Sequence, residues 1–379
     1  MDFDTFQKEA QKYDSTKEIL IPLMGLCGEI GEINSVLKKR YRDRRAYTHF
    51  TEHLREELGD TLWYLSSICS HLGLKLEDVA NENLRSDGTV SITHTCKDFP
   101  EYQERVKQTN GDRGLSFLSA LSKNAANLFK IYTTSDKKER ISEKFIKKMA
   151  KEVGDVLWYL ANIASLYSLE MSFVASNNID KIRKIHDEGE LSEFDKVFPD
   201  DESIPRQIGI KIIEITENGE SKVKMYLNDI ELGDELDDNS PKEDFYRFHD
   251  AFHLAYVAIL GWSPVMRKLL DRKRKSDTYT DRIQDGARAR ILEEAVSLYI
   301  FNDAEKNNLY EGSESIDLSV LKNVKELTKD LEVSSCTYKQ WEKAIINGYE
   351  IFRQLIEHRN GIVELDMDKQ SISFKKIEG

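Results

Sequence analysis

The chain has 379 residues, of which 40% are hydrophobic and 32% charged, a composition typical of a folded protein with two or three domains. The formal net charge of −13 excludes duplex nucleic acid as a main partner, because that surface demands a basic footprint. It does not exclude nucleotides, since a bound cation can mediate between acidic groups and phosphate.

Membrane and disulfide signals are missing from the sequence. We find no apolar run that approaches the length needed to span a bilayer, and the first residues have no signal-peptide pattern. The four cysteines show no CxxC spacing. These features predict a cytoplasmic protein with reduced thiols and no membrane association.

The first element with a clear pattern is a helix around residues 25–39. Its apolar residues recur at spacings of three and four, as on the buried stripe of an amphipathic helix. Glu29 and Glu32 lie three residues apart in this pattern, so they share a face and repel each other. A divalent metal ion or plain solvent would offset that repulsion. The apolar positions are Leu23, Leu26, Ile30, Ile33 and Leu37.

A second helix follows within residues 53–84 and carries the pair Glu57-x-x-Asp60. The basic turn between the two helices is short enough for an antiparallel hairpin, which would let both carboxylate pairs converge. Carboxylate oxygens suit Mg²⁺ or Mn²⁺ as ligands. Lys39 follows Glu32 by seven residues, nearly on the same face, where its ammonium group would meet a phosphate.

The segment 53–84 is repeated at 148–179 with a constant offset of 95 residues. The same offset places Asn124 and Asn127 at the positions of Glu29 and Glu32, so the second copy lacks both charges. We interpret the first copy as the one that handles charged ligands and the second as mainly a scaffold. The matched residues are Glu57, Gly59, Asp60, Leu62, Trp63, Tyr64, Leu65 and Asn83 with Glu152, Gly154, Asp155, Leu157, Trp158, Tyr159, Leu160 and Asn178.

The remaining chain begins with an acidic, proline-containing linker at 186–206. Two β-prone runs around Asn218–Gly219 predict one hairpin, and the alternating residues of 361–377 predict another. The helical block between them contains His249-Asp250-x-x-His253, which puts two imidazoles one turn apart, as in zinc hydrolases. Glu293 or Glu294 on a later helix would complete such a site. The alternative is that both histidines are hydrogen-bonded core residues.

Glu29, Glu32, Glu57 and Asp60 match the ExxE…ExxD pattern of the MazG-like, all-α NTP pyrophosphohydrolases, which the first copy resembles. The resemblance implies Mg²⁺-dependent cleavage of a nucleoside triphosphate between its α and β phosphates, giving monophosphate and pyrophosphate. It also implies that the four carboxylates are catalytic and hold the metal. Lys38, Lys39 and Asn83 would then help to place phosphate and sugar.

In this superfamily the sites lie near an interface between two helical units, so the degenerate copy is expected to form a wall of one working pocket. Whether Glu152, Asp155 and Asn178 contribute to that pocket stays open. Residues beyond the linker resemble a region found fused to MazG-like domains, and this likeness implies architecture without a mechanism.

The sequence therefore predicts a mainly α protein: tandem MazG-like four-helix units forming an intrachain pseudo-dimer, followed by an α+β domain with short β-hairpins. Its expected partner is a nucleoside triphosphate, and association into a homodimer is left open. Two alternatives remain: a nucleotide-binding sensor without turnover, and a metal-dependent hydrolase acting through His249 and His253. The predicted segments are 1–85 (complete site), 86–113 (connection), 114–185 (degenerate repeat), 186–206 (linker) and 207–379 (C-terminal domain).

Overall fold

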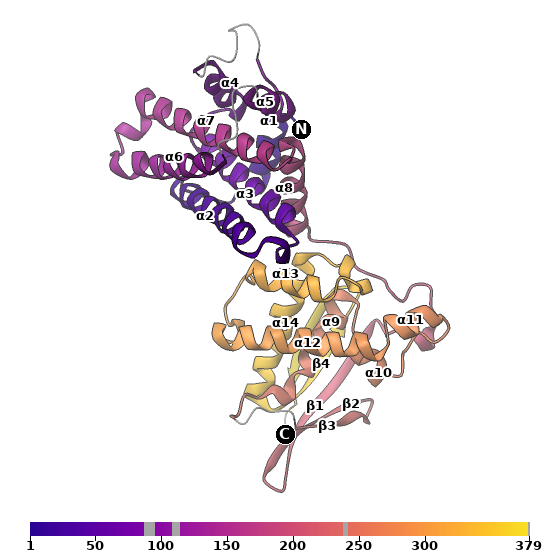
Figure 1. Ribbon diagram of the computed structural model, residues 1–379. Coiled ribbons are helices and arrows are strands. Elements are labelled where there is room, and N and C mark those ends of the chain that lie inside the picture. Colours follow the sequence, from indigo (N-terminus) through magenta and orange to yellow (C-terminus); the bar gives the residue numbers. More distant parts are fainter. Residues whose placement is uncertain (87–94, 108–113, 238–241, 378–379) are drawn as a thin grey trace. The chain divides into compact units, whose positions relative to one another are not determined.

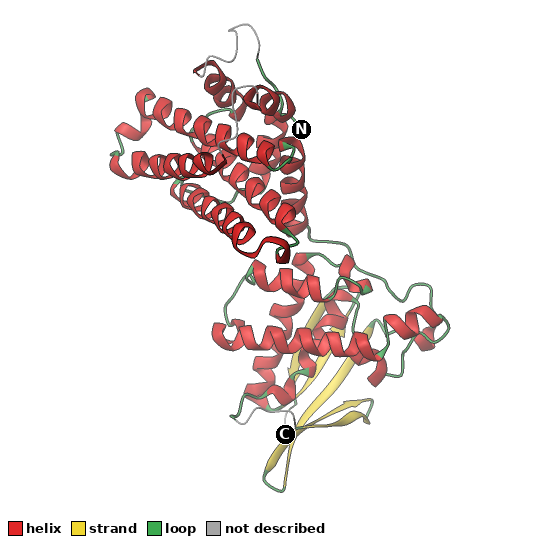
Figure 2. Cartoon of the chain, in the orientation of Figure 1, coloured by secondary structure: helices red, strands yellow, loops and turns green. Residues whose placement is uncertain are grey.

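The computed structural model describes residues 1–86, 95–107, 114–237 and 242–377. The chain divides into two compact units, Met1–Arg183 and Lys184–Gly379. The first consists of helices, and the second combines helices with a sheet (Figures 1 and 2). This confirms the predicted class, mainly α with a C-terminal α+β part.

The α-helices in the described part of the N-terminal unit fall into two sets of four. The first set is α1 (Phe3–Lys12), α2 (Leu20–Asp43), α3 (Phe50–His71) and α4 (Leu76–Ser86). The second set is α5 (Phe99–Lys107), α6 (Gly114–Thr134), α7 (Glu143–Leu166) and α8 (Met171–His186). Each helix of the first set has its counterpart in the second, which confirms two four-helix units.

Within residues 86–113, predicted as the connection between the copies, Phe99–Lys107 forms a helix, α5, which is the counterpart of α1. The rest of that segment, 87–94 and 108–113, lies outside the described residues. The constant offset of 95 residues did not reveal that α1 and α5 are equivalent, because the equivalent residues at the N-terminal ends of the copies differ by 96.

Gln7 and Gln103 are related by the offset of 96, and they make equivalent hydrogen bonds. The Oε1 atom of Gln7 accepts a hydrogen bond from the backbone N of Leu76 (2.8 Å), and Oε1 of Gln103 accepts one from Met171 N (2.9 Å). Each glutamine thus satisfies an unpaired backbone N–H at the start of α4 or α8.

Equivalent residues of the two copies also contact each other. Asp2 forms an isolated antiparallel bridge with Asp98, and the rings of Phe3 and Phe99 lie 4.4 Å apart. Contacts between a residue and its own equivalent are the mark of a twofold axis. The N-terminal unit is therefore an intrachain pseudo-dimer, as predicted.

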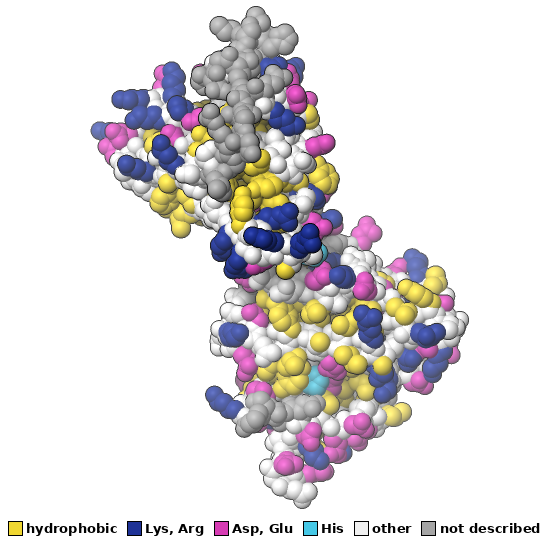
Figure 3. Space-filling view, viewed as in Figure 1, with side chains coloured by type: hydrophobic (Ala, Val, Ile, Leu, Met, Phe, Trp, Pro, Cys, Tyr) yellow, Lys and Arg dark blue, Asp and Glu magenta, His cyan; other side chains and the backbone are white. Residues whose placement is uncertain are grey.

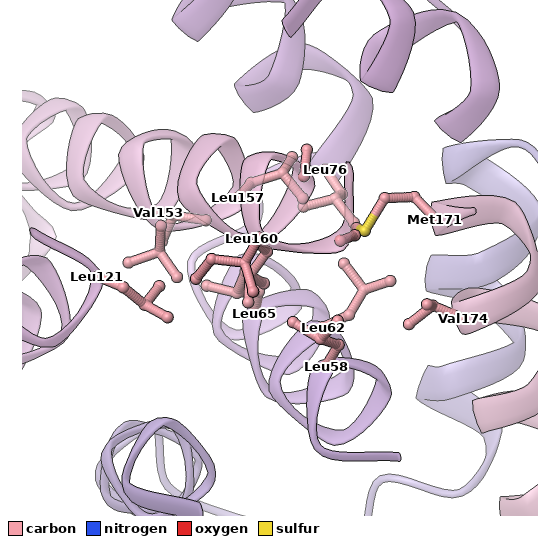
Figure 4. Close-up of a cluster of buried hydrophobic side chains, with 14 of the residues drawn as sticks. Leu58, Leu62, Leu65, Leu76, Leu121, Val153, Leu157, Leu160, Met171 and Val174 are labelled. Atoms are coloured by element: carbon pink, nitrogen blue, oxygen red, sulfur yellow. The ribbon is translucent and has the colours of Figure 1, made fainter. Parts of the chain in front are cut away.

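Both copies contribute to one hydrophobic core. Figure 4 shows side chains from α3 and α4 meeting side chains from α6, α7 and α8. Each copy alone would leave this apolar surface in water, and burial of a large aliphatic side chain contributes roughly 1.5–3 kcal/mol. The copies therefore depend on each other for stability. The labelled residues are Leu58, Leu62, Leu65, Leu76, Leu121, Val153, Leu157, Leu160, Met171 and Val174.

Among the described residues, one helical stretch, Leu20–Ala46, is long and apolar enough by composition to cross a membrane. The prediction that no apolar run approaches the length of a membrane span does not hold for this stretch. Glu29 and Glu32 are the only charged residues between Ile19 and Val36. The predicted apolar stripe of this helix is buried in the core of the unit, and a core helix passes the same test.

The described part of the C-terminal unit contains one five-stranded antiparallel sheet of order β3-β2-β1-β4-β5. Both predicted hairpins form, and pairing of β1 with β4 joins them. The strand after the first hairpin, β3, was not predicted. The strands are β1 (Gln207–Glu217), β2 (Glu220–Leu227), β3 (Ile230–Leu236), β4 (Asn360–Asp366) and β5 (Ser371–Lys376).

Helices pack on the sheet, and α9 and α14 contact both β4 and β5 (Figure 1). In β4 every second residue is buried (Gly361, Val363 and Leu365), as expected for a sheet with one covered face. The helices are α9 (Asp250–Leu260), α10 (Pro264–Leu269), α11 (Thr278–Ile283), α12 (Ala287–Ala304), α13 (Leu318–Leu327) and α14 (Tyr338–His358).

The predicted linker, 186–206, does not behave as a free connection. Ile204 is buried in the core of the C-terminal unit, and the Asp195 carboxylate pairs with the fully buried guanidinium of Arg267. Asp195 therefore neutralises a buried arginine, an arrangement that composition alone cannot distinguish from a solvated linker.

Charged side chains of both signs are interspersed over the face shown in Figure 3. Acidic and basic side chains thus lie side by side on this face. Mixed surfaces of this kind favour solubility without a strong field of one sign.

Candidate active site

Three carboxylates of the first copy converge between α2 and α3. Glu29, Glu57 and Asp60 can each place one oxygen within 4.8 Å of the other two. All three are half-buried, so the group is open to solvent on one side. The turn after α2 lets the two helices run as a hairpin, which brings residues 28 positions apart in the chain together.

Glu32, the fourth predicted ligand, is exposed and lies outside this group. It follows Glu29 by one turn of α2, about 4.5 Å along the axis at 1.5 Å per residue. Its negative charge still acts on Glu29. The structure therefore brings together three of the four predicted carboxylates and leaves the fourth at the rim.

Close approach of the carboxylates changes their protonation. Burial, together with the charges of Glu29 and Asp60, raises the pKa of Glu57 to about 8. Burial and the Asp60 charge also raise the pKa of Glu29 above its ordinary value. Without a cation, Glu29 and Glu57 thus resist carrying two negative charges at neutral pH.

The second copy supplies polar groups to this cluster from α8. Asn178 Nδ2 donates a hydrogen bond to Asp60 Oδ1 (2.7 Å), and Lys181 Nζ donates to Asp60 Oδ2. Lys181 also pairs with Glu56 (2.8 Å). The site is therefore composite: the carboxylates come from one copy, and the amide and ammonium groups come from the other.

A glycine makes this approach possible. A Cβ atom built on Gly59 would lie 2.9 Å from Asn178 Cβ, which is closer than real Cβ contacts. Gly154 meets Asn83 in the same way, at 3.0 Å. A glycine inside a helix costs roughly 1 kcal/mol relative to alanine, and here it lets the asparagine helix lie against the carboxylate helix.

Asn83 was predicted to serve the first site, but its Nδ2 donates to Asp155 Oδ1 of the second copy (3.0 Å). The constant offset between the copies shows which residues are equivalent. It could not show that each asparagine contacts the aspartate of the other copy. The residue that takes the predicted place beside Asp60 is Asn178.

The equivalent position in the second copy is neutralised. Asn127 Nδ2 donates to Glu152 Oε2 (3.4 Å), and Lys151 Nζ pairs with Asp155 (2.8 Å). Lys151 occupies the position of Glu56, so a cation replaces a carboxylate there. The second copy therefore keeps the packing of the first without its concentration of negative charge.

Lys38 and Lys39 lie near the C-terminal end of α2, where Lys38 is exposed and Lys39 half-buried. Both ammonium charges act on Asp43. They follow Glu29 by nine and ten residues, which is roughly 14–15 Å along the helix axis. Both lysines therefore lie well along the helix from the carboxylate cluster.

The donor set at the cluster fits a divalent cation. It consists of anionic oxygens from Glu29, Glu57 and Asp60, the ligands that Mg²⁺ and Mn²⁺ prefer. The raised pKa values of Glu29 and Glu57 show that the protein alone does not balance their charge. These three residues would hold the metal.

This charge imbalance predicts a pH-dependent stability of the metal-free protein. The pKa of Glu57 is about 8 in the folded protein against its ordinary 4.5, so between these two pH values the folded state keeps a proton that the unfolded state has lost. The contribution of Glu57 to the free energy of unfolding therefore falls as pH rises from 4.5 to 8.

Thermal melts in EDTA at pH 6 and pH 8 measure this contribution. We expect Glu57→Gln to reduce the drop in Tm between the two values, and added Mg²⁺ to raise Tm more at pH 8 than at pH 6. The matched variant Glu152→Gln serves as control and should keep the wild-type dependence. Equal pH dependence in wild type and Glu57→Gln would refute the raised pKa.

The second predicted group also comes together, in the C-terminal unit. His249, Asp250 and His253 can each place one ligand atom within 4.8 Å of the other two, and all three are buried. Glu293 and Glu294 approach from α12, with His253 Nδ1 lying 2.7 Å from Glu293 Oε1. Sequence spacing thus located these five residues correctly, although it could not choose between Glu293 and Glu294.

Sequence reasoning missed the role of Lys181. Asn178 could have been found, because the repeat matches it to Asn83. Lys181 has no such signal, since the matching position 86 holds serine. Only the packing of α8 against α3 brings this lysine to Asp60.

Comparison with known proteins gives two family matches. Residues 17–85, which include all four predicted carboxylates, match the model of the MazG nucleotide pyrophosphohydrolase domain. Residues 189–378, half of the chain, match the model of the MazG C-terminal domain.

A curated relative is the Gene 37 protein of Mycobacterium phage L5, which is 36% identical over 73 residues. The match covers 19% of this chain and 64% of the phage protein, less than two thirds of the relative's length. No solved structure matches the chain. From the two family matches, which together span the carboxylate site and the C-terminal unit, we conclude that this chain belongs to the MazG family.

Proposed function

We propose that the protein is an Mg²⁺-dependent nucleoside triphosphate pyrophosphohydrolase. One observation carries this proposal: the convergence of Glu29, Glu57 and Asp60 within the domain that matches the MazG nucleotide pyrophosphohydrolases. The reaction consumes one water molecule and breaks the bridge between the α and β phosphates. Its products are a nucleoside monophosphate and pyrophosphate.

Charge explains why such a cluster suits this substrate. A triphosphate carries several negative charges and is repelled by three carboxylates, so it binds there only with cations between them. Bound at the carboxylates, Mg²⁺ would supply Lewis-acid polarisation of phosphoryl oxygens and charge neutralisation. Glu29, Glu57 and Asp60 would hold the cation, and Asn178 fixes the direction of the Asp60 carboxylate.

Lys181 gives the site a positive charge of its own. It pairs with both Asp60 and Glu56 from the opposite side of the composite site. As an ammonium group on a long side chain, it can turn from a carboxylate toward a phosphate when substrate arrives. Lys38 and Lys39, farther along α2, bind the distal part of the nucleotide.

Incubation of the full chain with each NTP and dNTP, in Mg²⁺, Mn²⁺ or EDTA, tests the proposal. We expect equal amounts of monophosphate and pyrophosphate by ion-exchange chromatography, with no turnover in EDTA. Diphosphate and inorganic phosphate as products would contradict the proposed bond cleavage. Nucleotide binding seen as a shift in Tm without products would instead support the sensor.

A further inference from the structure

A second group of titratable residues, which the proposed reaction does not use, lies in the C-terminal unit. His249 precedes α9, and Asp250 and His253 lie on its first turn. These residues are 6%, 5% and 0% exposed. Glu294 faces them from α12, with its Oε2 atom 3.3 Å from His253 Nε2 and 3.8 Å from His249 Nε2. The two ring nitrogens thus meet at one carboxylate oxygen.

Both rings are held with Nε2 available as a ligand. His249 Nδ1 lies 2.9 Å from the carbonyl oxygen of Tyr246, which can only accept a hydrogen bond. The proton therefore resides on Nδ1 in the neutral ring, and the lone pair is on Nε2. The ring also stacks on that of Tyr246, with centroids 4.6 Å apart, which fixes its orientation.

His253 is oriented in the same sense by Glu293. The Glu293 carboxylate is fully buried and accepts hydrogen bonds from Ser263 Oγ (2.6 Å) and Val265 N (2.8 Å) as well as facing His253 Nδ1. A carboxylate that binds the second nitrogen of a histidine is the usual support for a metal ligand. This arrangement distinguishes Glu293, which orients the ring, from Glu294, which faces Nε2.

Two buried polar atoms in this group lack hydrogen-bond partners among the described residues. They are Asp250 Oδ2 and His253 Nε2, the latter 3.3 Å from Glu294 Oε2. An unsatisfied buried acceptor costs roughly 1–3 kcal/mol, so each calls for a partner that the protein does not provide. A cation placed among them would satisfy both at once.

We propose that His249, His253 and Glu294, completed by Asp250, form a binding site for a divalent transition-metal ion. Two imidazole nitrogens with carboxylate oxygens suit Zn²⁺, Mn²⁺ or Fe²⁺, whereas Mg²⁺ prefers oxygen ligands alone. Glu294 is 45% exposed and lines a surface depression with Lys268 and Arg290, which gives an ion a route of entry. The site is separate from the proposed pyrophosphohydrolase reaction and does not depend on it.

Metal binding to the full chain tests this site. The double variant Glu57→Gln, Asp60→Asn removes the first carboxylate cluster, so that any remaining stoichiometric ion belongs elsewhere. After stripping with chelator, isothermal titration with Zn²⁺ should show one equivalent bound, with elemental analysis agreeing. Excess Mg²⁺ should not compete.

Additional substitutions in that background locate the ion. Glu294→Gln, a half-exposed isosteric change, and His249→Gln should each weaken Zn²⁺ binding by about tenfold or more. Glu305→Gln, an exposed residue just past α12, is the control and should bind as the parent does. Circular dichroism checks that each variant is folded. Absence of stoichiometric Zn²⁺ from the folded double variant, or equal affinity in all variants, would overturn the proposal and leave the cluster as a buried ion-pair network.

Discussion

Glu57→Gln and Asp60→Asn are each expected to lower the rate of pyrophosphate release by about 100-fold or more, the scale on which removal of a preorganised electrostatic group acts. Each substitution keeps the size of the side chain and removes its negative charge, so the cluster loses a ligand without losing packing. Steady-state rates at saturating Mg²⁺ and NTP give the measurement. Because repulsion in the cluster falls, Glu57→Gln should not lower the Tm of the metal-free protein.

The repeat offers matched controls for these variants. Glu152→Gln and Asp155→Asn alter the same positions of the second copy, where Asn127 and Lys151 already offset the charge. Their rates should stay within roughly twofold of wild type, as for substitutions away from a site. Equal losses in both copies would show that the second copy takes part in catalysis directly. Wild-type rates in the first-copy variants would remove the basis of the proposed function.

Asn178→Ala carries the second large expected effect, because it tests whether the site is composite. Loss of the 2.7 Å hydrogen bond to Asp60 frees the carboxylate to rotate. Removing such a supporting contact typically costs 10–100-fold in activity or metal affinity. We therefore expect a fall of about that size in the rate, together with a higher Mg²⁺ concentration for half-maximal activity. This shift in Mg²⁺ dependence identifies Asn178 as a positioning residue, because a purely structural role would not produce the shift.

Asn83→Ala is the control, since Asn83 makes the equivalent 3.0 Å bond to Asp155 and lies against the equivalent glycine. Both variants lose one hydrogen bond to a carboxylate, so each should lose stability on the order of 1–3 kcal/mol. Only Asn178→Ala should change the Mg²⁺ dependence. The opposite outcome, with Asn83→Ala inactive and Asn178→Ala normal, would return the substrate-binding role to Asn83.

The predictions that succeeded rest on local periodicity. The apolar residues of α2, spaced by three and four, are buried together, and alternation in β4 puts Val363 and Leu365 on the covered face. Turn chemistry at Asn218–Gly219 located the first hairpin. These features depend on residues a few positions apart, where helix and strand geometry dictates which side chains share a face.

Contacts between residues far apart in the chain were predicted only in part. The offset of 95 residues established two equivalent copies, yet equivalence does not reveal which copy a helix packs against. The prediction for Asn83 did not foresee this crossing, in which α4 reaches to Asp155 and α8 to Asp60. Likewise, composition made 186–206 a linker, although Asp195 pairs with the buried Arg267.

By itself, then, the sequence determined the helices that carry the carboxylate pairs, the pairs themselves and the HDxxH group, because each depends on residues a few positions apart. The repeat was evident from its constant offset of 95 residues. Tertiary structure decided that Glu32 stays at the rim while Lys181 enters the site. It also decided that Glu293 orients His253 while Glu294 faces Nε2. The physical reason is that partners across a core are chosen by how helices fit together, and the close approach at Gly59 exists only once both copies have packed.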